Sequence, residues 1–288
     1  MNSILIAILV MGAIALISAL VLYGVSKKFA VEEDPRIGEV EEILPGANCG
    51  GCGFAGCAAM AEALVKGADA GSADGLFCPV GGQAVMDQVA TCLGITASKA
   101  EPQVAVIRCN GTCALRPTIA RYDGLRTCAA MSKAGSGESA CQYGCLGCGD
   151  CVKVCEFGAL SIDKTTGLPV VDEEKCTACG KCTKACPRQI IELRKRGPKG
   201  RRVYVACRNK DKGPVARVAC KAACIGCGKC QKACAFDAIT IENNLSYIDP
   251  VKCRLCTKCV EECPTGAIHK INFPAKSQKD NQQKEIQA

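Results

Sequence analysis

The longest uncharged stretch of the chain lies at its start. From Asn2 to Ser26 no side chain is charged, and a helix of about 20 apolar residues crosses a bilayer. A cleaved signal peptide would have a positive leader and a shorter apolar core. Lys27 and Lys28 follow directly, and by the positive-inside rule they place the C-terminal side in the cytoplasm. The pattern predicts a single transmembrane anchor at 1–26.

Beyond this anchor the apolar runs are short and are separated by polar residues and glycine. The acidic segment at 27–47 predicts a linker that enters a short helix, and the period of "QAVMDQVATCLG", which starts at Gln83, predicts a helix. Short apolar runs predict strands at 103–109, 159–162, 189–193, 238–241 and 267–271, and the apolar segments at 168–172 and 245–249 lead into the later cysteine blocks. The polar tail at 273–288 is predicted to be disordered. This mixture of short helices and strands predicts an α+β fold.

One cysteine pattern occurs twice in the chain. "CQYGCLGCGDCVKVC" begins at Cys141, and "CKAACIGCGKCQKAC" begins 79 residues later at Cys220. The alignment without gaps also pairs Cys128 with Cys207. An internal repeat of this kind indicates a duplicated structural unit. The predicted division is a transmembrane anchor at 1–26, a linker at 27–47, a small helical cysteine-rich domain at 48–85, an intervening cysteine-bearing region at 86–140, two repeated units at 141–196 and 197–272, and a tail at 273–288.

The cysteines are too numerous for an ordinary globular protein. The 288 residues include 27 cysteines and one histidine, a density typical of disulfide scaffolds or metal proteins. Thiols stay reduced in the cytoplasm, which favours metal. The spacing C-x2-C-x2-C-x3-C occurs four times and is that of bacterial ferredoxins, in which the fourth cysteine binds the neighbouring cluster. The units at 141–196 and 197–272 are therefore predicted to be tandem bacterial-type dicluster ferredoxin-like domains. Structural zinc would need two C-x2-C pairs instead.

Crosswise ligation therefore combines three cysteines of one block with the last cysteine of its partner block. We name each predicted ligand set by its first member. The sets are Cys145, Cys148, Cys151 with Cys186; Cys176, Cys179, Cys182 with Cys155; Cys224, Cys227, Cys230 with Cys263; and Cys253, Cys256, Cys259 with Cys234. A different spacing, C-x2-C-x4-C-x20-C, predicts a fifth [4Fe-4S] set on Cys49, Cys52, Cys57 and Cys78, so the region at 48–85 is predicted to be a small helical 4Fe-4S domain. An Ala-rich helix would begin there and stabilise the negative cluster.

Seven cysteines remain outside these five sets, and their roles stay open. One alternative is a sixth cluster on Cys109, Cys113, Cys128 and Cys141. The repeat argues against it, because the positions aligned with Cys109 and Cys113 in the second unit are Arg188 and Glu192. The other alternative is that these four cysteines, and likewise Cys207 and Cys220, are buried as small apolar side chains. Cys92 lies in the predicted helix and is expected in the core.

The formal charge of +8 does not indicate nucleic-acid binding. Each oxidised cluster with four thiolates carries about −2, so five clusters would offset the excess of basic residues. The run "RKRGPKGRR" at 194–202 predicts a solvated turn, with docking of an acidic partner as the alternative. His269 is expected at the surface. The sequence offers no general base, nucleotide-binding loop or open metal site, so no catalytic residue is predicted.

The anchor, the motif "LPGANCGGCGFAGCAAMAEAL", the pair Cys78-Pro79 and the block "CLGCGDCVKVC" together resemble the B subunit of Rnf complexes. These are ion-translocating ferredoxin:NAD oxidoreductases. The resemblance implies a single-pass subunit of the cell inner membrane that relays electrons between soluble ferredoxin and other Rnf-type membrane subunits, coupled to Na+ or H+. It implies no substrate site in the chain itself. Two alternatives stay open: a polyferredoxin subunit of another membrane redox enzyme, and a reductase of a redox-sensing regulator.

Overall fold

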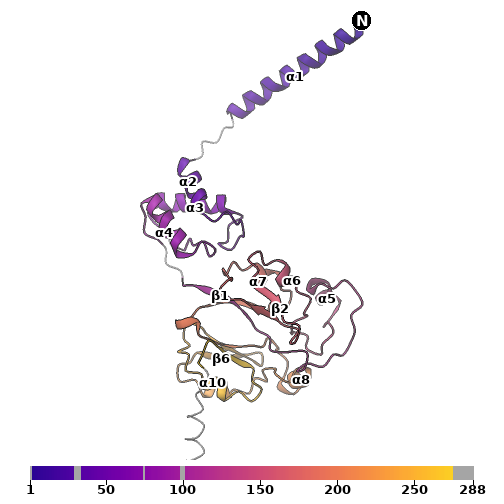
Figure 1. Cartoon of the computed structure of the whole chain (residues 1–288), viewed down its shortest axis with the longest axis vertical. Helices are drawn as coiled ribbons and strands as arrows, with labels where there is room; N and C mark the ends of the chain where they lie inside the picture. Colours follow the sequence, from indigo (N-terminus) through magenta and orange to yellow (C-terminus); the bar gives the residue numbers. More distant parts are fainter. Residues whose placement is uncertain (1, 29–33, 74, 98–100, 275–288) are drawn as a thin grey trace, which may run out of the picture.

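The computed structural model describes residues 2–28, 34–73, 75–97 and 101–274 (Figure 1). Helix α1 (Asn2–Lys28) stands apart from the rest of the molecule, and its side chains from Leu5 onward are exposed. From Leu5 to Lys28 its mean hydropathy is 3.0, so this helix is long and apolar enough to cross a membrane. One apolar helix of this length is compatible with the expected single-pass anchor. The predicted tail lies outside the described residues from position 275 onward.

A small helical domain lies between α1 and the remaining units (Figure 1). Its helices are α2 (Pro35–Ile43), α3 (Cys57–Asp69) and α4 (Gly82–Leu93). Helix α2 begins where the Asp34 carboxylate accepts a hydrogen bond from the Arg36 N–H, the usual way to satisfy a first-turn amide. Val40 is fully buried in the core of this domain. The second half of the predicted linker therefore belongs to the domain, and so does α4 beyond residue 85.

The first ferredoxin-like unit is built from two antiparallel strand pairs and three short helices. Strand β1 (Gln103–Ile107) pairs with β4 (Ile191–Lys195), and β2 (Leu160–Ile162) pairs with β3 (Pro169–Val171). The helices are α5 (Cys128–Ala134), α6 (Asp150–Lys153) and α7 (Lys181–Ala185). Because β1 pairs with β4, the unit includes residues of the predicted intervening region.

The second unit repeats this arrangement. Strand β5 (Arg202–Val205) pairs with β8 (Ile268–Ile271), and β6 (Ile239–Glu242) pairs with β7 (Leu245–Ile248). Its helices are η1 (Pro198–Gly200), α8 (Gly213–Ala219), α9 (Lys229–Lys232) and α10 (Lys258–Glu261). The five predicted strands are all present, shortened by up to two residues at their ends or shifted by one or two. Strands β3 and β7 lie in the apolar segments that lead into the later cysteine blocks and were not predicted as strands, and neither was β5.

The strand pairing corrects the alignment of the two halves. Strands β1 and β5 hold the same place in their units, and each ends two residues before a cysteine, Cys109 or Cys207. Cys207 is therefore equivalent to Cys109, and the gapless pairing with Cys128 is wrong. The first unit has 31 residues between Cys109 and Cys141 where the second has 12 between Cys207 and Cys220. The longer segment carries Cys113 and Cys128.

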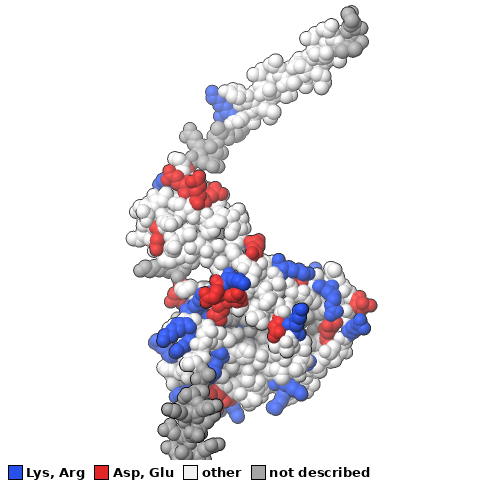
Figure 2. Space-filling model, in the orientation of Figure 1, with Lys and Arg blue, Asp and Glu red and all other residues white. Residues whose placement is uncertain are grey.

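The basic run at 194–202 is not a solvated turn over its whole length. Its middle forms η1, but Arg194 and Arg202 lie in strands and are 2% and 5% exposed. Arg202 forms an ion pair with Glu173. On the face shown in Figure 2, basic and acidic side chains are intermixed over the two units, while acidic side chains gather over α2. Two of the arginines of the run thus face inward, away from any docking partner.

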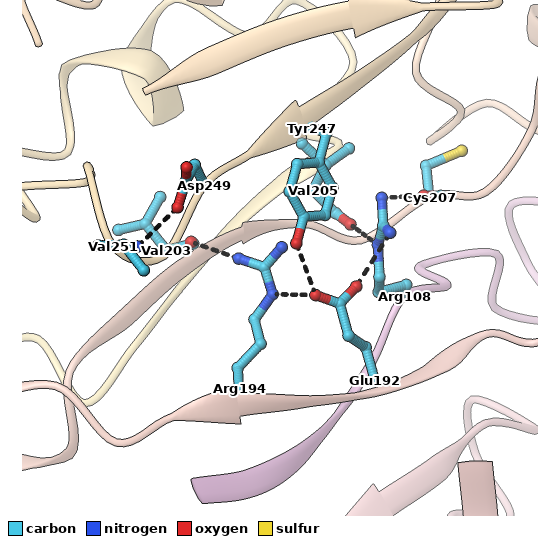
Figure 3. Close-up of polar contacts among 9 residues, drawn as sticks. All are labelled: Arg108, Glu192, Arg194, Val203, Val205, Cys207, Tyr247, Asp249 and Val251. Atoms are coloured by element: carbon cyan, nitrogen blue, oxygen red, sulfur yellow. Dashed lines mark hydrogen bonds and ion pairs between the residues drawn. The ribbon is translucent and has the colours of Figure 1, made fainter. Parts of the chain in front are cut away.

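A buried polar network joins the two units through Glu192 of β4 (Figure 3). Arg108 and Arg194 donate to opposite oxygens of this carboxylate, each at 3.0 Å. Tyr247 of β7 donates its hydroxyl to the same carboxylate at 3.0 Å. The arginines also donate to strand β5 carbonyls, Arg108 to Val205 and Arg194 to Val203. Charges from the first unit are therefore held by backbone of the second.

Candidate iron–sulfur cluster sites

Each ferredoxin block turns sharply at the residue before its short helix. Gly149 has φ 81° ahead of α6, and Gly180 and Gly228 have φ 77° ahead of α7 and α9. The left-handed conformation suits glycine because a Cβ is disfavoured there. In the fourth block Thr257 takes this place with φ 63°. The turn lets the first three cysteines of a block curl toward one point.

Two cavities of the second unit are lined by the predicted ligand sets. The cavity of about 350 Å³ is lined by Cys224, Cys227, Cys230 and Cys263. The cavity of about 330 Å³ is lined by Cys234, Cys253, Cys256 and Cys259. In both, three cysteines of one block meet the last cysteine of the other block. The structure therefore brings these eight residues together crosswise, as the spacing predicted.

Three cysteines of the Cys145 set, Cys145, Cys151 and Cys186, line a cavity of about 370 Å³ in the first unit, and Cys148 is not among its lining residues. Cys128, the first residue of α5, also lines it and lies beside Cys148. Burial raises the pKa of Cys145 to about 12, with nearby thiolates adding to the shift. The sequence did not indicate a fifth cysteine at this site.

The Cys176 set gathers on the side of the first unit nearer the helical domain. Burial raises the pKa of Cys182 to about 12, and the charges of Cys176, Cys179, Cys151 and Cys155 add to it. The sulfur of Cys155 accepts a hydrogen bond from the Ala159 N–H at 3.3 Å. These neighbours include all the partners predicted for Cys182 within the set, together with Cys151 of the Cys145 set.

The Cys49 set lies in the loops that precede and follow α3. Gly51 N–H donates to the Cys49 sulfur at 3.5 Å, and Gly81 N–H donates to the Cys78 sulfur at 3.4 Å. Cys52 and Cys49 lie close enough to Cys78 for their charges to raise its pKa, although burial is the larger cause. Cys57 is the first residue of α3, so the positive end of that helix faces the set, as expected.

The loop of the Cys49 set packs directly on the loop of the Cys176 set. A Cβ on Gly51 would lie 2.9 Å from both the Cα and the carbonyl oxygen of Cys179. Lys181 lies near the sulfurs of Cys49 and Cys179 and forms an ion pair with Glu156. A cleft of about 1270 Å³ beside this contact is lined by residues of both loops. The helical domain thus places its cysteines against one particular block of the first unit.

These sites suit a cluster better than a single ion. In four-thiolate zinc the sulfurs stand about 3.8 Å apart, given Zn–S bonds of about 2.3 Å. Within the described part of the chain, no three Cys, His, Asp or Glu side chains converge tightly enough to hold one metal ion. The cysteines surround wider cavities instead, and backbone N–H groups point at their sulfurs, a feature that tunes iron–sulfur centres. The donor set therefore fits [4Fe-4S] groups.

The remaining cysteines separate into three environments. Cys92 is exposed, with its sulfur 3.6 Å from a Glu39 carboxylate oxygen; the expectation of a core position is wrong. Cys113 is exposed beside Gly167. Cys109, Cys141, Cys207 and Cys220 line one cavity between the two units, which sequence reasoning missed. His269, expected at the surface, is half-buried on β8 beside the Tyr204 ring.

Two tandem dicluster units and a third cysteine-rich domain define an iron–sulfur electron-transfer protein. Comparison with known families agrees: residues 144–190 and 223–267 match the 4Fe-4S dicluster domain, and residues 44–72 match an Fe-S cluster family. The chain is 47% identical to the B subunit of the Na+-translocating ferredoxin:NAD+ oxidoreductase complex of Acetobacterium woodii, over 93% of this chain and 78% of that protein. It is 46% identical to the B subunit of the proton-translocating complex of Clostridium ljungdahlii, over 94% of both chains.

A third relative comes from an archaeon. The B subunit of the ion-translocating oxidoreductase complex of Methanosarcina acetivorans is 41% identical over 93% of this chain and 99% of that protein. Identity of this degree over nearly the full length of several relatives shows the family. The chain belongs to the B-subunit family of the Rnf-type ion-translocating ferredoxin:NAD oxidoreductase complexes.

Proposed function

We propose that this subunit relays electrons between soluble ferredoxin and the membrane partners of its complex. The helical domain and both ferredoxin-like units would face the cytoplasm, with α1 as a single-pass anchor in the cell inner membrane. Lys27 and Lys28 at the C-terminal end of α1 support this orientation. A bound [4Fe-4S] cluster accepts and gives up one electron at a time. The chain itself would supply no substrate site.

We propose five ligand sets: the Cys49, Cys145, Cys176, Cys224 and Cys253 sets as defined above. The observation that carries the relay is their arrangement in series. The Cys49 set belongs to the domain nearest α1 and lies against the Cys176 set through the contact of Gly51 with Cys179. The Cys176 and Cys145 sets share one unit and exchange their last cysteines. The second unit repeats this pair of sets.

The chain contributes a rigid and dry frame to each set. Buried cysteines such as Cys145, Cys182 and Cys259 are kept from water, and that burial raises their pKa to about 12. Iron binding must therefore displace their protons, which couples cluster assembly to the folded frame. Backbone N–H groups that point at the sulfurs stabilise the thiolate form once the metal is present.

The test is to change one ligand of the set nearest the anchor. In Cys57→Ser, reduced ferredoxin should still reduce the sets of both ferredoxin-like units, while ferredoxin-driven NAD+ reduction by the complex in membrane vesicles should fall at least 100-fold. Cys92→Ser is the matched control, because Cys92 is exposed and lies near Glu39 rather than near a ligand set. Turnover that survives in Cys57→Ser would refute the route through the helical domain.

Purification from membranes tests the assignment of partners. The proposed function predicts that a flavin-bearing subunit and an NADH-binding subunit co-purify with the chain in mild detergent. A hydrogenase or a quinone-linked dehydrogenase in their place would support the polyferredoxin alternative. Recovery with a redox-sensing regulator alone would support the third function.

A further inference from the structure

The cavity between the two ferredoxin-like units has the features of a further cluster site. It measures about 340 Å³, against about 370, 350 and 330 Å³ for the three cavities lined by ferredoxin ligand sets. Four cysteines line it, which we call the inter-unit cysteines: Cys109 and Cys141 from the first unit, Cys207 and Cys220 from the second. None belongs to a ferredoxin block, and all four thiols are free. Here too, four cysteines line one cavity.

The sulfurs of the inter-unit cysteines accept N–H groups. Cys109 accepts from the Cys145 N–H at 3.5 Å, and Cys207 accepts from the Asn209 N–H at 3.4 Å. The Asn209 side-chain amide donates to the Cys141 sulfur at 3.6 Å. The Ala222 N–H points at the Cys220 sulfur. Cysteines buried only as small apolar residues need no such donors, whereas metal-bound thiolates are stabilised by them.

Charge and space at this cavity also suit a negative group. Arg108, Arg116 and Arg208 line it, and no Asp or Glu is among its lining residues. A cluster with four thiolates carries about −2, which Arg116 and Arg208 would offset, since Arg108 is paired with Glu192. A Cβ on Gly111 would lie 3.3 Å from the Cys220 sulfur and 3.6 Å from the Cys109 sulfur. Glycine at this position leaves open the space between two prospective ligands.

The site lies between the two units' first ligand sets. The Cys145 N–H donates to Cys109, and the Cys224 N–H donates to Cys207. In each unit, therefore, the first cysteine of a ferredoxin block contacts one of the inter-unit cysteines. The equivalence of Cys109 with Cys207, and of Cys141 with Cys220, means that each unit contributes the same two positions. One unit alone has half a site, which accounts for cysteines that occur as a pair in each repeat.

We propose that Cys109, Cys141, Cys207 and Cys220 bind a sixth [4Fe-4S] cluster that bridges the two ferredoxin-like units. The quartet differs from the sequence-derived alternative, because Cys113 and Cys128 lie elsewhere. The proposal rests on the proposed function only for the role of the bridge. That role is to connect the Cys145 set with the Cys224 set, so that both units belong to one series.

The experiment counts iron and acid-labile sulfide in the full-length chain, purified in detergent without oxygen. Wild type should hold about 24 irons, and fully reduced protein should give about six electron spins. Cys207→Ser should hold about 20 irons and give one spin fewer, with the other signals unchanged. Cys113→Ser is the matched control and should equal wild type. Alkylation of native protein followed by mass spectrometry should leave all four inter-unit cysteines unmodified.

Other results would overturn the proposal. One is a wild-type content of about 20 irons, with or without one zinc per chain. The other is a loss of iron in Cys113→Ser equal to the loss in Cys207→Ser. If Cys207→Ser does not fold, the wild-type iron count and the alkylation pattern still decide. The two proposals fail separately. If Cys57→Ser loses turnover and wild type holds about 20 irons, only the bridging cluster is rejected. If Cys57→Ser keeps full turnover and wild type holds about 24 irons, only the proposed electron route through the helical domain is rejected.

Discussion

Glu192 offers the sharpest test of how the two units are held together. Its carboxylate is the counter-charge for Arg108 and Arg194, which are 3% and 2% exposed. Both guanidinium groups also lie about 5 Å from the Tyr247 ring, at 5.1 and 5.0 Å. Burial lowers the pKa of Arg108, and the Glu192 charge acts against this shift. The arginines therefore depend on this carboxylate to remain buried as cations.

We predict that Glu192→Ala destabilises the chain by about 3 kcal/mol. Removal of one partner from a buried ion pair costs about 3–5 kcal/mol, and the lower end applies because Glu192 itself is 25% exposed. About 3 kcal/mol corresponds to roughly a 150-fold change. If the contact between the two units is broken in the transition state for unfolding, nearly all of this loss of free energy appears as a faster unfolding rate. Glu192→Gln keeps an acceptor without the charge and should lie between wild type and Glu192→Ala.

The assay is the rate at which cluster absorbance disappears in guanidinium chloride without oxygen. Glu156→Ala is the matched control, because it also removes an ion-paired carboxylate, but one that is 53% exposed. An exposed pair contributes about 1 kcal/mol at most, so the control should bleach no more than about fivefold faster than wild type. Bleaching of Glu192→Ala at the rate of Glu156→Ala would show that the buried network does not hold the units together.

Two further predictions concern single positions. Gly51→Ala should force its Cβ against the Cys179 backbone, and because overpacking costs about 1–3 kcal/mol, amide hydrogen exchange in the loop at 176–182 should be roughly 5- to 150-fold faster, with iron content unchanged. Gly38→Ala is the control, because its Cβ would meet nothing within 4 Å and the exchange rate should not change. Equal exchange rates in the two variants would contradict the contact between Gly51 and Cys179. Burial lowers the pKa of His269, so its contribution to stability is full above pH about 6.5 and is lost as the pH falls toward the folded-state pKa. Between pH 7 and 5.5 wild type should therefore lose more stability in denaturant than His269→Gln, and parallel losses would argue against a buried neutral imidazole.

The sequence was most informative where ligands are close together in the chain. Within C-x2-C-x2-C-x3-C, short loops force three cysteines toward one point, and the fourth faces the partner block. Local geometry therefore predicts the crosswise groups that line the cavities of the second unit. The strands could be predicted for a similar reason, since each apolar run between glycines and charges is long enough for only one short strand.

Features that depend on packing over longer distances were missed or placed wrongly. Strand β5 begins with Arg202, which looked like part of a basic turn until Glu173 supplied its partner. Cys92 was expected in the core, but α4 buries Met86, Val89 and Ala90. Those positions follow the helical spacing of three and four, and Cys92 lies off that stripe. The acidic segment with few apolar residues predicted a linker that enters a short helix, but α2 belongs to the domain core, where Val40 and Leu44 are buried and Ile37 packs against them.

The inter-unit cavity and the Glu192 network form one continuous structure. Arg108 precedes Cys109 in the chain, and its guanidinium donates to the carbonyl oxygens of Val205 and Cys207 as well as to Glu192. One side chain thus fixes the backbone beside a prospective ligand in each unit. A charged interface was not needed merely to join the units, since replacing buried ion pairs with apolar residues is often neutral or stabilising. A guanidinium at this point does something that an apolar residue cannot: it orients the carbonyls of the opposite unit and places positive charge beside four thiolates. The geometry of the interface and the binding of a negative group between the units are therefore consequences of the same residues.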